Sequence, residues 1–243
     1  MKYLLRFILF VCVSNSLSAN DRSYDWVLEQ YGNNETSEIE AHANGEIGGV
    51  KYIAIIARRT SPANNDGPAV LVFKKTANRP TIIAKIDLQG DYAAGYSVAI
   101  RNGSIYLEHW VGHHGWHGRR YQFKQTDHGF RMIGAEHQSQ QLGCYAGDDS
   151  PTCSEREVWS GASYNFPMAS AICWQETINQ RRERRIKEMS RRSEKWLQPK
   201  SGVRHQMTFR PINPPSLDGF DFLEFSLPKA CYFDHKNRLQ LER

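Results

Sequence analysis

The densest set of chemically capable side chains lies in one short stretch, residues 108–118, with the sequence EHWVGHHGWHG. Four of its residues are histidines: His109, His113, His114 and His117. Neutral imidazole is a common ligand of zinc, copper and nickel, and a turn can bring two or three ring nitrogens to one ion. One hypothesis is therefore a metal site at His113, His114 and His117, with zinc as the metal. The interpretation we favour is a hairpin tip whose histidines are solvated and hold no cofactor.

The same stretch and the residues just after it could instead bind an organic ligand. Trp110, Trp116, Arg119 and Arg120 combine flat amphipathic rings with fixed positive charge. Such groups hold sugars, peptides and anionic polymers. The competing interpretation is that the aromatic residues form cross-strand pairs that stabilise an ordinary sheet.

Signatures of common enzyme classes are missing from the sequence. It contains no Gly-x-Ser-x-Gly, no His-Glu-x-x-His, no phosphate-binding loop and no dinucleotide glycine pattern. Four carboxylates, Glu108, Asp127, Glu136 and Glu155, would serve glycoside cleavage only if the fold brought two of them together. The sequence thus favours a non-enzymatic binding or structural protein. The alternative is a metal-dependent hydrolase that uses the histidines of 109–117.

These residues fall within a region of short segments rich in β-branched and aromatic residues, which predict strands. The predicted strands are 50–58, 69–75, 81–87, 96–101, 104–111, 119–125 and 130–136. Turn-forming residues separate them, so we expect an antiparallel meander. Such a mainly β fold closes as a sandwich, a barrel or a partial propeller, and the sequence does not choose between them.

Asn102-Gly103 is the sharpest local signal, because both central positions of a type I′ turn require positive φ. The tight hairpin predicted there fixes the register of the following strand. It places Ile105, Leu107 and His109 on one face and Glu108 on the other. We expect the first face to look inward.

The rest of the chain is more varied. Residues 24–31 predict a short helix, and the polar stretch from there to Gly49 predicts a loop. Residues 163–174 predict extended chain interrupted by Pro167. Residues 181–195 predict a basic, solvent-facing helix, and residues 203–210 predict another strand.

The N-terminal residues 1–19 have the pattern of a cleaved export signal. Lys2 and Arg6 precede an apolar run of about ten residues, half of what a membrane span needs, and Ala19 ends a small-residue cleavage site. We therefore expect a periplasmic or secreted protein without a transmembrane segment, with a formal net charge of +3 after loss of Lys2 and Arg6. The domains predicted are a β domain at 20–160 and a C-terminal extension at 161–243 packed on it.

Four cysteines remain after the signal: Cys144, Cys153, Cys173 and Cys231. In an oxidising compartment they should pair, and three connectivities are open. We favour Cys144 with Cys153, which closes a short polar loop, and Cys173 with Cys231, which ties the C-terminal segment to the body. The spacings match no common structural zinc pattern.

The basic segment 181–195 carries eight Lys or Arg residues and three Glu residues. In an exported protein, nucleic acid is excluded as its partner. Its candidate partners are an anionic envelope polymer, lipid headgroups or an acidic protein surface, with binding that weakens as salt rises. The alternative is a solvated helix face without a partner.

Two short motifs, FRMIGAE at 130–136 and SGASYNF at 160–166, resemble a pattern in uncharacterised secreted β-rich bacterial proteins. The resemblance spans residues 90–166, about a third of the chain. That family has no assigned activity, so the resemblance implies an exported β-rich domain and no functional residues.

Overall fold

The structure is a computed structural model of the chain. It describes residues 24, 26–27, 37–59, 68–77, 79–88, 94–112, 116–142, 156–179, 203–222, 225–228, 231–233 and 239–240.

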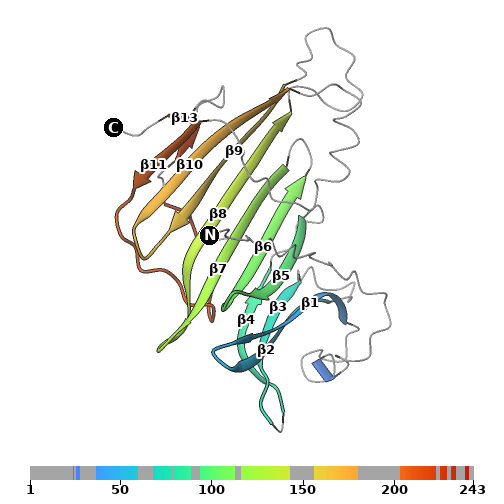
Figure 1. Cartoon of the computed structure of the whole chain (residues 1–243). Coiled ribbons are helices and arrows are strands. Elements are labelled where there is room, and N and C mark those ends of the chain that lie inside the picture. Colours follow the sequence, from blue (N-terminus) through green and yellow to red (C-terminus); the bar gives the residue numbers. More distant parts are fainter. Residues whose placement is uncertain are drawn as a thin grey trace, which may run out of the picture.

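Most of the described chain is strand, arranged in two large antiparallel sheets and one small one (Figure 1). The four-stranded sheet consists of β1 (Ser37–Ile47), β2 (Val50–Arg59), β3 (Ala69–Lys74) and β4 (Thr81–Asp87), in that order. The seven-stranded sheet consists of β5 (Ala94–Arg101), β6 (Ser104–Gly112), β7 (Trp116–Thr126), β8 (Gly129–Leu142), β9 (Arg156–Asn165), β10 (Ser170–Asn179) and β11 (Val203–Thr208). The two-stranded sheet pairs β12 (Tyr232–Phe233) with β13 (Leu239–Gln240).

The predicted mainly β, antiparallel organisation is confirmed, and each large sheet is a meander in which successive strands pair. All seven strands expected between residues 50 and 136 are present, and so is the one expected at 203–210. The extended chain predicted at 163–174 is the hairpin of β9 and β10, with Pro167 in its turn. The domain boundary placed between residues 160 and 161 falls inside β9, so the large sheet continues across it.

The loop predicted up to Gly49 is wrong, because β1 occupies residues 37–47. Its inward positions carry Ala41, Ala43 and Gly45, which give little apolar signal in the sequence. The structure shows why they are small: a Cβ on Gly45 would overlap the side chain of Ile100 on β5. Close approach of β1 to β5 therefore excludes a larger residue at position 45.

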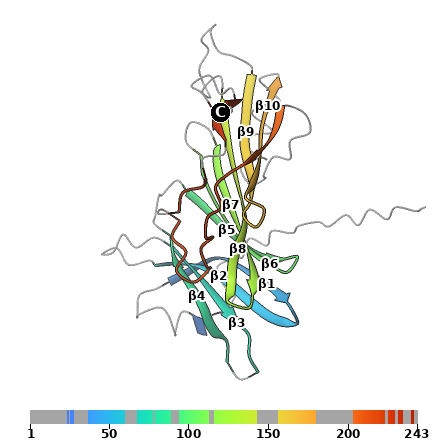
Figure 2. The ribbon, with the colours of Figure 1, turned by 90° about the vertical axis from the view of Figure 1, so that its left-hand side faces the viewer.

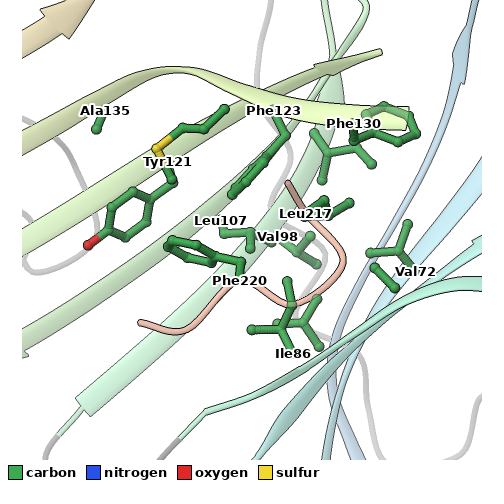
Figure 3. Packing of buried hydrophobic residues seen from close by; sticks show 14 of the residues in the cluster. Val72, Ile86, Val98, Leu107, Tyr121, Phe123, Phe130, Ala135, Leu217 and Phe220 are labelled. Atoms are coloured by element: carbon green, nitrogen blue, oxygen red, sulfur yellow. The ribbon is translucent and has the colours of Figure 1, made fainter. Parts of the chain in front are cut away.

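One apolar core joins the two large sheets. Its buried members include Val72 and Ile86 from the four-stranded sheet and Leu107 and Phe123 from the seven-stranded sheet. The segment 211–222 runs between the two sheets, and Figure 3 shows Leu217 and Phe220 among side chains of both. Figure 2 shows the seven-stranded sheet rising away from the smaller one, so much of its length extends beyond β1–β4.

The hairpin between β5 and β6 forms as predicted. Asn102 and Gly103 both have positive φ, at 50° and 69°, and Arg101 pairs with Ser104. Ile105 and Leu107 are buried, which confirms the inward face of β6. We call this face of the seven-stranded sheet the core face and the opposite one the outer face.

A β-bulge interrupts the pairing of β7 with β8. Gln122 pairs with Gly134 and Phe123 pairs with Met132, so Ile133 is an extra residue on β8. Because of it, Met132 and Ala135, three positions apart, are both buried on the core face.

The predicted disulfide between Cys173 and Cys231 is present, with a Cα–Cα distance of 5.7 Å. It ties β10 to the chain end across 58 residues. The predicted pair Cys144–Cys153 lies outside the described residues.

Helical expectations are tested only at one place. Trp26 and Val27 are helical, and Tyr24 lies in a 3₁₀ turn. The rest of the helix predicted at 24–31 and the whole basic helix predicted at 181–195 lie outside the described residues. Within the described chain, no helix has the length and apolar character to cross a membrane.

Candidate functional site

Strand alternation divides the predicted ligand-binding residues between the two faces of the seven-stranded sheet. Arg119 pairs with His109 and lies on the core face, whereas Arg120 pairs with Glu108 and lies on the outer face. Trp110 shares the outer face with Arg120, and His117 shares the core face with Arg119. The single binding tip expected from the sequence is thus two separate surfaces.

Part of the predicted metal site cannot be placed. His113 and His114 lie outside the described residues, and of Trp116 only the backbone is described. In the described part of the chain, no group of three or more His, Cys, Asp or Glu side chains is arranged to hold a metal ion. His117 is near one further histidine, His137 on β8, which the sequence did not single out.

On the core face, a row of polar side chains crosses the middle of the sheet. His109, Arg119 and His137 occupy paired positions on β6, β7 and β8. The ring of His109 stacks on Tyr96 of β5, with 4.9 Å between ring centroids. The row lies next to the apolar core, because the adjacent paired positions are Leu107, Tyr121 and Ala135.

Tyr121 marks the border between core and polar row. Its side chain is fully buried, and its ring packs edge-on against Phe220, 4.9 Å away, and Phe222, 5.1 Å away. Figure 3 shows its hydroxyl pointing away from the labelled apolar side chains. No described residue gives this buried hydroxyl a hydrogen bond of good geometry.

Arg119 dominates the electrostatics of the core face. Burial, together with the charges of Arg119 and His117, lowers the pKa of His137 to about 4. Burial raises the pKa of Tyr164 to about 12 and also raises the pKa of Tyr121, while the Arg119 charge opposes both shifts. At neutral pH this cluster therefore holds one fixed cation among neutral imidazole and phenol groups.

The outer face carries an ion-pair bridge across three strands. Arg120 on β7 binds Glu108 on β6 through Nε, at 2.6 Å, and Glu136 on β8 through an Nη atom, at 2.9 Å. Ser97 donates a hydrogen bond to the other oxygen of Glu108, at 2.9 Å. Two of the four carboxylates named from the sequence therefore meet, with a guanidinium between them.

A cleft of about 540 Å³ opens beside this bridge. The guanidinium of Arg101 lies over the ring of Tyr106, 4.8 Å from its centroid, and forms one wall. The amide of Gln122 donates a hydrogen bond to the Ser104 hydroxyl, at 3.1 Å. The lining residues are Arg101, Asn102, Tyr106, Arg120, Gln122, Gly134, Ala135, Glu136, Ser163 and Tyr164.

The outer-face tryptophans are engaged in packing. Trp110 occupies the space above Gly95, and Trp174 occupies the space above Gly161, so a Cβ on either glycine would overlap an indole ring. For Trp110 the packing interpretation that competed with ligand binding therefore has direct support.

Sequence reasoning missed His137 and the burial of the Tyr121 hydroxyl. The available signal was the alternation of side chains between the two faces of each strand. In a meander, residues on the same face as Arg119 pair with residues on that same face of the next strand.

Comparisons with protein-family models, curated proteins and solved structures found no match for this chain.

Proposed function

We propose that this protein is an exported, non-enzymatic binding protein that holds a neutral, hydroxyl-rich ligand of the carbohydrate class in the cleft beside Arg120. The observation that supports it best is the bridge in which Arg120 is held by Glu108 and Glu136 at the cleft. Its geometry is fixed across three strands, so ligand binding need not first order these long side chains.

The charge of the cleft favours a neutral ligand. Arg101 and Arg120 contribute two positive charges, and Glu136 and the Glu108 behind it contribute two negative ones. The remaining polar groups, such as Gln122 and Ser163, both donate and accept hydrogen bonds. Hydroxyl groups, which also do both, suit this lining better than an ion does.

The proposed location rests on the signal pattern of residues 1–19 and is supported by the Cys173–Cys231 disulfide. Disulfides persist in oxidising compartments and are rare in the reducing cytosol. A periplasmic or extracellular site of action would bring the cleft into contact with envelope or environmental glycans.

Calorimetric titration of the mature protein with chitohexaose, cellohexaose and maltohexaose tests this proposal. We expect saturable binding of at least one, and a loss of about tenfold or more in affinity in Tyr106→Ala, because the ring forms a cleft wall. Ile172→Ala, an exposed change on the same face outside the cleft lining, is the matched control and should bind as the wild type.

Two outcomes would contradict the proposal. Absence of binding to all three sugars would exclude the carbohydrate class, and equal affinity of the Tyr106 variant would exclude the cleft. Chromatography of the sugars after incubation separates binding from catalysis, since shortened products would show that the protein hydrolyses the sugar and would contradict a non-enzymatic role.

A further inference from the structure

We propose that the core face of the seven-stranded sheet carries a second site, which binds an oxyanion, a carboxylate or a phosphate group. The guanidinium of Arg119 and the hydroxyl of Tyr121 would hold the anion, with the imidazoles of His117 and His137 beside them. This site lies on the opposite face of β7 from the Arg120 cleft and does not depend on the function proposed for that cleft.

The buried hydroxyl of Tyr121 is the first observation. A buried hydroxyl without a partner costs about 1–3 kcal/mol, so nearly all such groups in folded proteins are paired. Tyr121 is fully buried, and its hydroxyl lies close to the Arg119 guanidinium but makes no hydrogen bond of good geometry with a described residue. A guanidinium only donates, so a ligand that accepts from the hydroxyl would supply the missing acceptor and explains why a tyrosine is there.

The charge balance around Arg119 is the second observation. None of the ion pairs found among the described residues includes Arg119, in contrast to Arg120 with its two carboxylates. The core-face positions paired around it are His109, His137, Leu107, Tyr121 and Ala135, none of them acidic.

The chemistry of the cluster suits an oxyanion. A guanidinium presents planar N–H donors that match carboxylate and phosphate, and a protonated phenol adds one O–H donor. Burial raises the pKa of Tyr121, so its hydroxyl keeps the proton it would donate. The neutral imidazole of His137 supplies one more N–H donor.

The test uses the mature, oxidised protein and NMR titration with two probes, inorganic phosphate and acetate, at constant ionic strength set with sodium chloride. We expect saturable shifts at β7 and β8 with one or both probes, and the stronger response identifies the anion class. Arg119→Gln should lower affinity more than tenfold. Lys124→Gln, which removes an exposed cation from the same strand, is the matched control and should leave affinity unchanged.

Tyr121→Phe separates a binding role from a structural one. We expect its affinity for the responding probe to fall about tenfold while its melting temperature stays equal to or above that of the wild type, because no internal hydrogen bond is lost. Equal shifts in Arg119→Gln and Lys124→Gln would overturn the site, as would a wild type that shows no saturable shift with either probe. A Tyr121→Phe variant that melts lower and binds normally would assign the hydroxyl to folding and overturn its role.

Discussion

His137 makes a quantitative prediction about stability in mild acid. Its pKa is about 4 in the folded protein, against 6.5 for an unperturbed histidine, chiefly because the imidazole is buried. As the pH falls below 6.5, the imidazole of His137 becomes protonated in the unfolded chain but stays neutral in the folded protein. The stabilisation is therefore complete above pH 6.5 and is lost as the pH falls toward 4.

The size of the effect follows from the shift. A difference of 2.5 pKa units would amount to about 3 kcal/mol once both states are protonated, and to about 2.5 kcal/mol at pH 4.5. For a chain of this size the latter is a drop of roughly 5–10 °C in melting temperature.

Thermal and urea unfolding of the wild type and of His137→Gln at pH 7.5 and pH 4.5 would measure it. The variant loses buried contacts and should be less stable than the wild type at pH 7.5, but its stability should fall less between the two pH values, by about 2.5 kcal/mol. His128→Gln, at an exposed turn, is the control for loss of an imidazole. If wild type and His137→Gln lost the same free energy between the two pH values, the inference that His137 is neutral in the fold would be refuted.

Three further changes test the packing and the charge network. Arg120→Gln leaves two facing carboxylates uncompensated, so urea unfolding should show a loss of about 3 kcal/mol, and a loss below about 1 kcal/mol would show that the bridge is unimportant. Gly161→Ala places a methyl group where Trp174 lies, and its stability should fall by about 1–3 kcal/mol, with altered tryptophan fluorescence. The double variant Cys173→Ser, Cys231→Ser should lose about 4 kcal/mol of stability, and equal melting of the oxidised protein and this variant would contradict the disulfide's role.

What the sequence predicted well was local. Strands rich in β-branched residues, the turn at Asn102-Gly103 and the pairing of Cys173 with Cys231 all follow from short-range chemistry or compartment. β1 was missed because its small residues are dictated by contact with β5, a partner far along the chain, and not by their own strand propensity.

The candidate sites were predictable only in part, for the same reason. Alternation alone separates Arg119 from Arg120, but the groups that give each its chemistry come from other strands. Nothing local to Tyr121 shows that its side chain is buried, since the phenyl rings that pack against its ring belong to residues about a hundred positions later. Burial of a polar atom is a property of tertiary packing, so the composition and spacing of residues do not predict it.

The bulge at Ile133 sets the phase of everything that follows it on β8. If the same residues alternated strictly from Met132 with no bulge, Glu136 would turn to the core face and His137 to the outer face. The guanidinium of Arg120 would then lose a carboxylate, and the polar row beside Arg119 would gain one. The bulge thus assigns acid and imidazole to their respective surfaces, and a deletion of Ile133 would remove the bulge while leaving the pairs Arg120–Glu136 and Arg119–His137 in register.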